Sequence, residues 1–112
     1  MHMVNATLCS TSREEPWAAN VDFEVRGTAW RVELHTKYTH YKNVVENSNV
    51  VIVYKTAGFE IIAKGTASVG EPTSDNIAVA SISLNWLRLV ENDTVTEYTD
   101  TAEIERVVVS HT

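Results

Sequence analysis

The sequence predicts a mainly β protein, a small antiparallel barrel or sandwich, built as a single domain over residues 1–112. Apolar and polar residues alternate in several segments, as expected for strands with one face on a core and one in water. These segments follow one another at short, regular spacing and are separated by compact turns. Only four glycines and two prolines occur, so long irregular connections are not expected.

The composition excludes several classes of function. A hydrophobic share of 44% with 21% charged residues is ordinary for a soluble globular protein. The net charge of −6 argues against nucleic acids and against anionic membrane surfaces, because both reward clustered Lys and Arg. No apolar run approaches the roughly 20 residues of a membrane span, and no signal peptide precedes Val4, so we expect a cytoplasmic protein. The single cysteine, Cys9, is interpreted as a small core residue of an alternating strand.

The first half of the chain predicts four strands and one helix. The predicted strands cover residues 1–11, 17–25, 29–35 and 50–54, with a hairpin turn at residues 26–28. The last of them, VVIVY, is continuously apolar and β-branched, which is typical of a central strand buried on both faces. A helix is expected to begin at Tyr38 or Thr39 and to end at residues 47–49. Tyr41, Val44 and Val45 would form its buried face, at i, i+3, i+4 spacing.

The second half predicts longer strands, at residues 59–69, 77–91 and 95–99. Gly65 is expected to mark a bulge or a close backbone approach in the first of these. In the second, the apolar residues change from even-numbered to odd-numbered positions near Trp86, which predicts a bulge there. A loop is expected at residues 70–76, a hairpin turn at residues 92–93, and a short helical turn capped near Asp100 or Thr101 with Glu103. Residues 107–109 are interpreted as a last strand.

The stretch from Leu34 to Val45 carries the functional prediction. It reads LHTKYTHYKNVV and is the only run in this acidic chain that has cations and no carboxylate. Hydroxyls, amides and two ammonium groups beside a strand end are the donors that a phosphate group needs. The candidate ligands in this stretch are Thr36, Lys37, Tyr38, Thr39, His40 and Lys42.

Simpler interpretations of these residues remain open. Lys37 and Lys42 also suit a solvated pair at a helix start, and His40 suits a surface side chain as well as a phosphate donor. The i, i+5 spacing of His35 and His40 is poor for zinc, and no second cysteine is present to complete a site, so no metal is expected. No nucleophile motif supports a hydrolase, and no catalytic residue is assigned.

Large side chains outside this stretch have structural explanations as well as functional ones. Trp17, Trp30 and Trp86 are expected to fill a core or a dimer interface, with stacking on an aromatic ligand as the alternative, foremost for Trp17. Arg88 is expected to form a cross-strand ion pair with Glu97 or Glu105.

The order of predicted elements resembles the pyridoxamine 5′-phosphate oxidase-like, FMN-binding split β-barrel superfamily, foremost its short general-stress-protein-like members. The resemblance covers roughly residues 4–91. Pro16, Val21 and Phe23 match a P-x-x-x-P-V-x-F strand, with Asn20 in place of the second proline. Gly65 and Ala67 match a later G-x-A. The implied fold is a split barrel of six to seven antiparallel strands, Greek-key-like, with one or two short helices.

The family holds the flavin phosphate with a motif like T-N-Y-x-S-R-K, and the chain matches it in part. Thr36, Tyr38 and Lys42 match its Thr, Tyr and Lys, whereas His40 replaces the Ser and Tyr41 replaces the Arg. Arginine is the residue suited to bidentate phosphate binding, so its loss weakens the expected FMN affinity. The arginine of the oxidase branch is also missing near Ala19 and Asn20, which argues against true pyridoxamine-phosphate oxidase activity.

The resemblance implies FMN bound across a homodimer interface, with Lys37, Lys42 and a protonated His40 compensating for the lost arginine. Backbone groups of Asn20, Val21 and Asp22 and of residues 34–36 would then meet the polar edge of the flavin ring. Three hypotheses follow: an FMN-dependent oxidoreductase acting on a small organic substrate, a flavin- or phospho-ligand-binding or sensing module without redox turnover, and a ligand-free dimer. A deazaflavin or haem in place of FMN stays open.

Overall fold

The computed structural model describes residues 2–12 and 16–112, and shows seven strands and two helices within them. The elements are β1 (His2–Ser10), β2 (Trp17–Arg26), β3 (Ala29–His35), α1 (Thr39–Glu46), β4 (Asn49–Lys55), β5 (Phe59–Val69), β6 (Ile77–Glu91), β7 (Thr94–Tyr98) and α2 (Thr101–His111). Every strand expected over residues 2–99 is present, with bounds within two residues of those predicted in the described parts. The helix α1 begins and ends where the sequence predicts.

The strands close into an antiparallel barrel. Their order is β3-β2-β1-β4-β5-β6, and β6 pairs back to β3 over seven residue pairs, from Ala29–Ser83 to His35–Ile77. The strand β7 adds to β6 outside the closed ring. Two of the seams are short: β2 pairs β3 only over residues 24–26, and β1 pairs β4 only over residues 7–9. The strands part beyond these pairs, so the predicted split barrel is confirmed.

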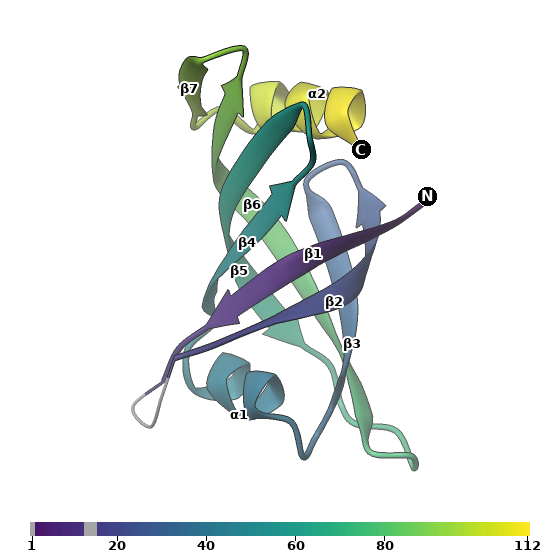
Figure 1. The fold of residues 1–112 in the computed structure, drawn as a ribbon. Coiled ribbons are helices and arrows are strands. Elements are labelled where there is room, and N and C mark those ends of the chain that lie inside the picture. Colours follow the sequence, from purple (N-terminus) through teal and green to yellow (C-terminus); the bar gives the residue numbers. More distant parts are fainter. Residues whose placement is uncertain (1, 13–15) are drawn as a thin grey trace.

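The inward faces of the strands form one core. Its largest fully buried side chains include Trp30 and Phe23, which pack edge to face with ring centroids 5.4 Å apart. This confirms the core interpretation of Trp30. Figure 1 shows α1 at one end of the barrel, below the β1–β2 side, and α2 at the opposite end beside β6 and β7. Neither helix is long and apolar enough to cross a membrane.

Both predicted irregularities of the long hairpin β5–β6 are confirmed, and they are one feature. Lys64 pairs with Trp86 whereas Gly65 pairs with Leu84, so Asn85 is the extra residue of a bulge in β6. A Cβ built on Gly65 would lie 2.7 Å from Ile82 Cγ2 and 2.8 Å from the Ser83 carbonyl oxygen. Only glycine therefore lets the two backbones approach this closely.

The C-terminal segment differs from its prediction. Residues 107–109 belong to α2, which runs to His111, and not to a last strand. Ile104, Val107 and Val108 are buried at i, i+3, i+4 spacing, so helical periodicity overrides the β preference of three consecutive valines. The side chain of Asp100 caps the helix by accepting from the Ala102 N–H at 3.0 Å, as the sequence predicts.

Two burial predictions on the β1–β4 seam are wrong. In β4 the side chains of Val50 and Ile52 are buried, but those of Val51 and Val53 are only half-buried. Cys9 pairs with Val51 and with Ala18, and partners across antiparallel strands share a face. Because Leu8 and Ser10 face the core, Cys9 lies half-buried on the outside of the barrel.

The buried face of α1 is also rotated from its prediction. His40, Asn43 and Val44 are buried, Tyr41 packs partly against the core, and Val45 is 59% exposed. A polar partner in β1 explains how His40 and Asn43 can face inward, as described below.

Candidate functional site

The turn between β3 and α1 holds the centre of the predicted phosphate site. Its backbone is fixed by hydrogen bonds from three successive N–H groups. Thr36 donates to the Asn76 carbonyl at 2.8 Å, Lys37 donates to His35 Nδ1 at 3.1 Å, and Tyr38 donates to the His35 carbonyl at 2.9 Å. These amides are therefore engaged within the protein, and a bound anion would depend on side chains and on the first N–H groups of α1.

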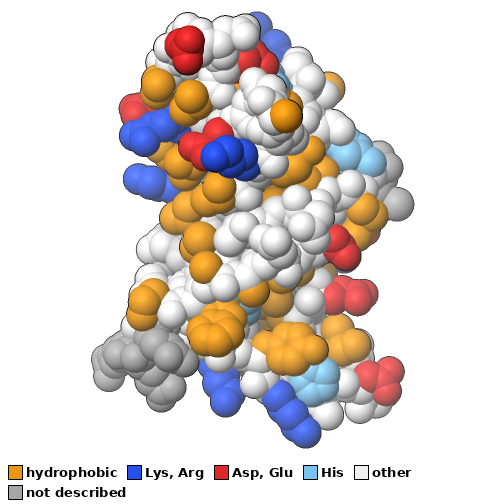
Figure 2. Space-filling view, viewed as in Figure 1, with side chains coloured by type: hydrophobic (Ala, Val, Ile, Leu, Met, Phe, Trp, Pro, Cys, Tyr) orange, Lys and Arg blue, Asp and Glu red, His pale blue; other side chains and the backbone are white. Residues whose placement is uncertain are grey.

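The side chains around this turn suit an anion. Lys37 and Lys42 are exposed and form no ion pair with any described residue, while Thr36 and Thr39 are half-buried. Tyr38 is the N-cap of α1 but its side chain makes no capping hydrogen bond, and no acidic residue lies in the first turn. The first N–H groups of a helix have no partner inside it, so this end of α1 favours negative charge. Figure 2 shows Lys or Arg side chains at the α1 end, next to exposed hydrophobic ones.

His40 does not belong with these exposed groups. It is 4% exposed, and its Nδ1 lies 2.6 Å from the buried Ser10 Oγ, which also accepts a hydrogen bond from Asn43 Nδ2 at 3.3 Å. The surface alternative for His40 is therefore wrong. Burial lowers the pKa of His40, because the charged imidazolium is disfavoured away from water. A protonated His40 is consequently a poor replacement for the arginine missing from the phosphate motif.

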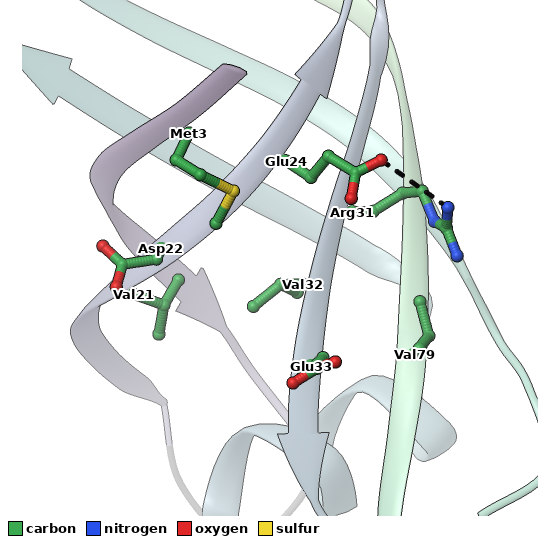
Figure 3. A pocket seen from close by; sticks show the side chains of 8 residues that line it. All are labelled: Met3, Val21, Asp22, Glu24, Arg31, Val32, Glu33 and Val79. Carbon is green, nitrogen blue, oxygen red and sulfur yellow. Dashed lines mark ion pairs between the residues drawn. The ribbon is translucent and has the colours of Figure 1, made fainter. Parts of the chain in front are cut away.

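A hollow of about 510 Å³ opens where β2 and β3 part. It is lined by Met3, Val21, Asp22, Glu24, Arg31, Val32, Glu33 and Val79. Figure 3 shows these side chains around the gap between the two strands, with the charged groups at its rim. Two of the three residues predicted to face the flavin ring, Val21 and Asp22, line this hollow. The third, Asn20, is exposed on β2 and accepts a hydrogen bond from Thr7 Oγ1 at 2.7 Å.

The predicted residues thus form two groups. The residues lining the hollow come from β1, β2, β3 and β6, whereas the predicted phosphate ligands lie on the following turn and α1. Sequence reasoning missed Arg31 and Glu33 as lining residues of the hollow. Their signal was available, since both are outward positions of the alternating segment that leads directly into the cationic stretch.

The remaining aromatic and basic residues have structural roles. Arg88 donates from Nη2 to Glu97 Oε1 at 2.9 Å, which confirms the predicted ion pair. Trp86 lies on the outside of the barrel, with the Lys64 ammonium 4.5 Å from its ring centroid. Within the part of the chain that the structure describes, no group of three or more His, Cys, Asp or Glu side chains could hold a metal ion.

Solved structures with the same fold come from bacterial proteins of low sequence similarity. General Stress Protein 26 from Bacillus anthracis superposes with a TM-score of 0.69 at 14% identity, over 87% of this chain and 91% of that one. A pyridoxamine 5′-phosphate oxidase-related, FMN-binding protein from Nostoc punctiforme superposes with a TM-score of 0.69 at 7% identity, over 86% of each chain.

A third similar structure is that of a heme binding protein. The heme binding protein from Mycobacterium smegmatis superposes with a TM-score of 0.76 at 18% identity, over 92% of this chain and 55% of that one. No known family model and no curated protein sequence matches the chain. The similarity is therefore one of architecture, and at these identities it extends to the fold alone. The chain has the split-barrel fold of the pyridoxamine 5′-phosphate oxidase-like proteins.

Proposed function

We propose that the chain binds FMN and acts as a flavin-dependent oxidoreductase on a small organic substrate. The observation that carries the proposal is a pair of exposed ammonium groups, Lys37 on the turn that follows β3 and Lys42 on α1, neither of which forms an ion pair with a described residue. A phosphate monoester carries close to two negative charges near neutral pH, so two ammonium groups match it. Thr36, Thr39 and the first N–H groups of α1 would add uncharged donors.

The hollow between β2 and β3 supports the same proposal. It combines apolar surface from Met3, Val21 and Val79 with polar groups at its rim, as expected at a site for a flat ring with a polar edge. Its carboxylates repel a phosphate, so the phosphate end of the cofactor belongs at the cationic turn and the ring end belongs at the hollow. A bound flavin would supply hydride or electron transfer, and the chain would bind and orient it.

A homodimer is part of the proposal. Cys9, Ala18 and Val51 form a row across three strands on the outside of the barrel, and Trp17, at the start of β2, is 44% exposed. These residues line another hollow, of about 360 Å³, and its lining residues among those that the structure describes are all uncharged. Exposed apolar surface of this kind is commonly covered by a partner, and the partner proposed is a second copy of the chain. The proposed location of this homodimer is the cytoplasm.

The test of the proposed function is the visible spectrum of freshly purified protein, followed by titration with FMN. Absorbance near about 450 nm, the property of the flavin itself, or saturable quenching of added FMN fluorescence would support it. Colourless protein that leaves the fluorescence of added FMN unchanged would reject it.

A non-catalytic module is the second candidate, and the burial of His40 favours it. Without the family's arginine, and with His40 buried, the phosphate group would be held by ammonium groups alone and would lack a bidentate guanidinium. This candidate predicts FMN binding with no oxidation of NADH or NADPH above the rate of free FMN. Measured turnover of either nicotinamide in the presence of FMN would exclude it.

A further inference from the structure

The hollow between β2 and β3 has an uneven charge distribution. Among the described residues of its lining, Asp22, Glu24 and Glu33 supply carboxylates and Arg31 supplies a cation. The Arg31 Nη1 lies 3.7 Å from Glu24 Oε1, and Arg26 Nε lies 3.7 Å from the same oxygen. Figure 3 shows Arg31 and Glu24 facing each other across the strand pair. The guanidinium of Arg31 is therefore already turned toward a protein carboxylate.

The other two carboxylates differ in their partners. Asp22 Oδ1 accepts a hydrogen bond from Asn5 Nδ2, a neutral donor, at 2.9 Å, and Asp22 forms no ion pair within the described part of the chain. Glu33 is exposed and makes no hydrogen bond or ion pair with any described residue. Beside these charges, Met3 and Val79 provide apolar walls, and Met3 is 63% exposed there.

We infer that this hollow, in the flavin-free chain, binds a small organic cation, such as a primary amine on a compact apolar body, and rejects small anions of similar size. The Glu33 carboxylate supplies the counter-charge, and Met3 and Val79 contact the apolar body. An anion entering the hollow would meet the carboxylates of Asp22 and Glu33 and a guanidinium that lies 3.7 Å from Glu24 Oε1. The inference does not depend on the proposed function: it concerns the flavin-free chain, in which the cation would occupy the hollow that a flavin ring would otherwise fill.

The test uses flavin-free protein in which the methionine methyl groups carry ¹³C, with the Met3 signal assigned through Met3→Leu. Benzylamine, benzyl alcohol and benzoate are titrated at low salt. We expect benzylamine to shift the Met3 signal with at least about tenfold higher affinity than benzoate, and added salt to reduce that preference. Glu33→Gln should weaken benzylamine binding about threefold, the size of one exposed ion pair. The matched control Glu71→Gln, on an exposed loop, should leave the affinity unchanged.

Two results would overturn the inference. One is equal binding of all three probes, and the other is a Met3 signal that none of them shifts. An FMN titration of the same sample separates this inference from the proposed function. If the protein binds benzylamine but not FMN, the proposed flavin site is rejected and the cation site is supported. If it binds FMN but not benzylamine, the cation site is rejected and the flavin site is supported.

Discussion

His40 Nδ1 lies 2.6 Å from Ser10 Oγ, and both side chains are buried between α1 and β1. Asn43 Nδ2 donates to the same hydroxyl at 3.3 Å, so one serine joins two polar side chains of α1 to the barrel. Within the described residues, His40 Nε2 is the buried side-chain atom that has no hydrogen-bond partner. The docking of α1, which carries the proposed phosphate ligands, thus depends on a small polar cluster inside an otherwise apolar core.

Ser10→Ala should destabilise the protein by about 1–3 kcal/mol, because it removes the buried hydroxyl that His40 Nδ1 contacts and to which Asn43 Nδ2 donates. The free energy of unfolding, measured by urea denaturation, checks this. Ser81→Ala, at an exposed position of β6, is the control and should change stability by less than about 0.5 kcal/mol. Equal effects of the two substitutions would show that the cluster does not stabilise the fold.

Stability should fall as the pH drops below the ordinary pKa of histidine, about 6.5. Burial lowers the pKa of His40 in the folded chain, so the unfolded chain takes up the proton first and is favoured in acid. The full contribution of neutral His40 is present above that pH and is lost progressively below it.

Urea unfolding at about pH 7.5 and about pH 5.5 measures this dependence. His40→Gln should flatten it, whereas His2→Gln, at an exposed position of β1, should preserve it. A pH dependence that is the same in His40→Gln as in the wild type would place its cause elsewhere.

Gly65→Ala should cost about 1–3 kcal/mol, because the added methyl meets Ile82 Cγ2 and the Ser83 carbonyl oxygen at less than van der Waals distance. Gly58→Ala provides the contrast, since a Cβ there meets no atom within 4 Å. Thermal and urea unfolding of the two variants should therefore differ clearly. If Gly65→Ala were as stable as the wild type, the close approach of the two backbones at the bulge would be contradicted.

Trp17→Glu should convert the proposed homodimer to a monomer, because it places a charge in the apolar surface formed with Cys9, Ala18 and Val51. Sedimentation velocity at micromolar concentration measures the change. Val109→Glu, at a 65% exposed position of α2, should remain dimeric. A wild-type protein that sediments as a monomer at these concentrations would contradict the proposed dimer.

Local patterns in the sequence predict most of the fold, and the errors arise where a distant partner decides. Alternation fixes the strands, and the parity switch near Trp86 locates the bulge at Asn85. The prediction for the buried face of α1 is wrong because it considers the helix alone. Ser10, thirty residues away from His40, provides the hydrogen-bond partner that lets the imidazole be buried. Three valines after residue 106 favour a strand locally, whereas burial against the barrel selects a helix.

The candidate site was predictable only in part, for the same reason. The cationic stretch from Leu34 to Val45 is contiguous in sequence, so its exposed Lys37 and Lys42 could be found from the local sequence alone. The hollow combines residues from four strands, and Arg31 and Glu33 enter it because β2 and β3 part beyond Glu24. The length of a strand pairing is set by the closure of the whole barrel, which no local pattern reports.

The most direct test compares the affinities of FMN and riboflavin, which differ only in the phosphate, for the wild type and for the double variant Lys37→Ala/Lys42→Ala. We expect the wild type to bind FMN at least about tenfold more tightly than riboflavin, a difference of about 1.4 kcal/mol in binding free energy. The double variant should bind both equally, while Lys55→Ala, at an exposed position of β4, should keep the wild-type preference. Wild-type protein that binds neither compound, or binds both with the same affinity, would contradict the assignment of this turn as a phosphate site.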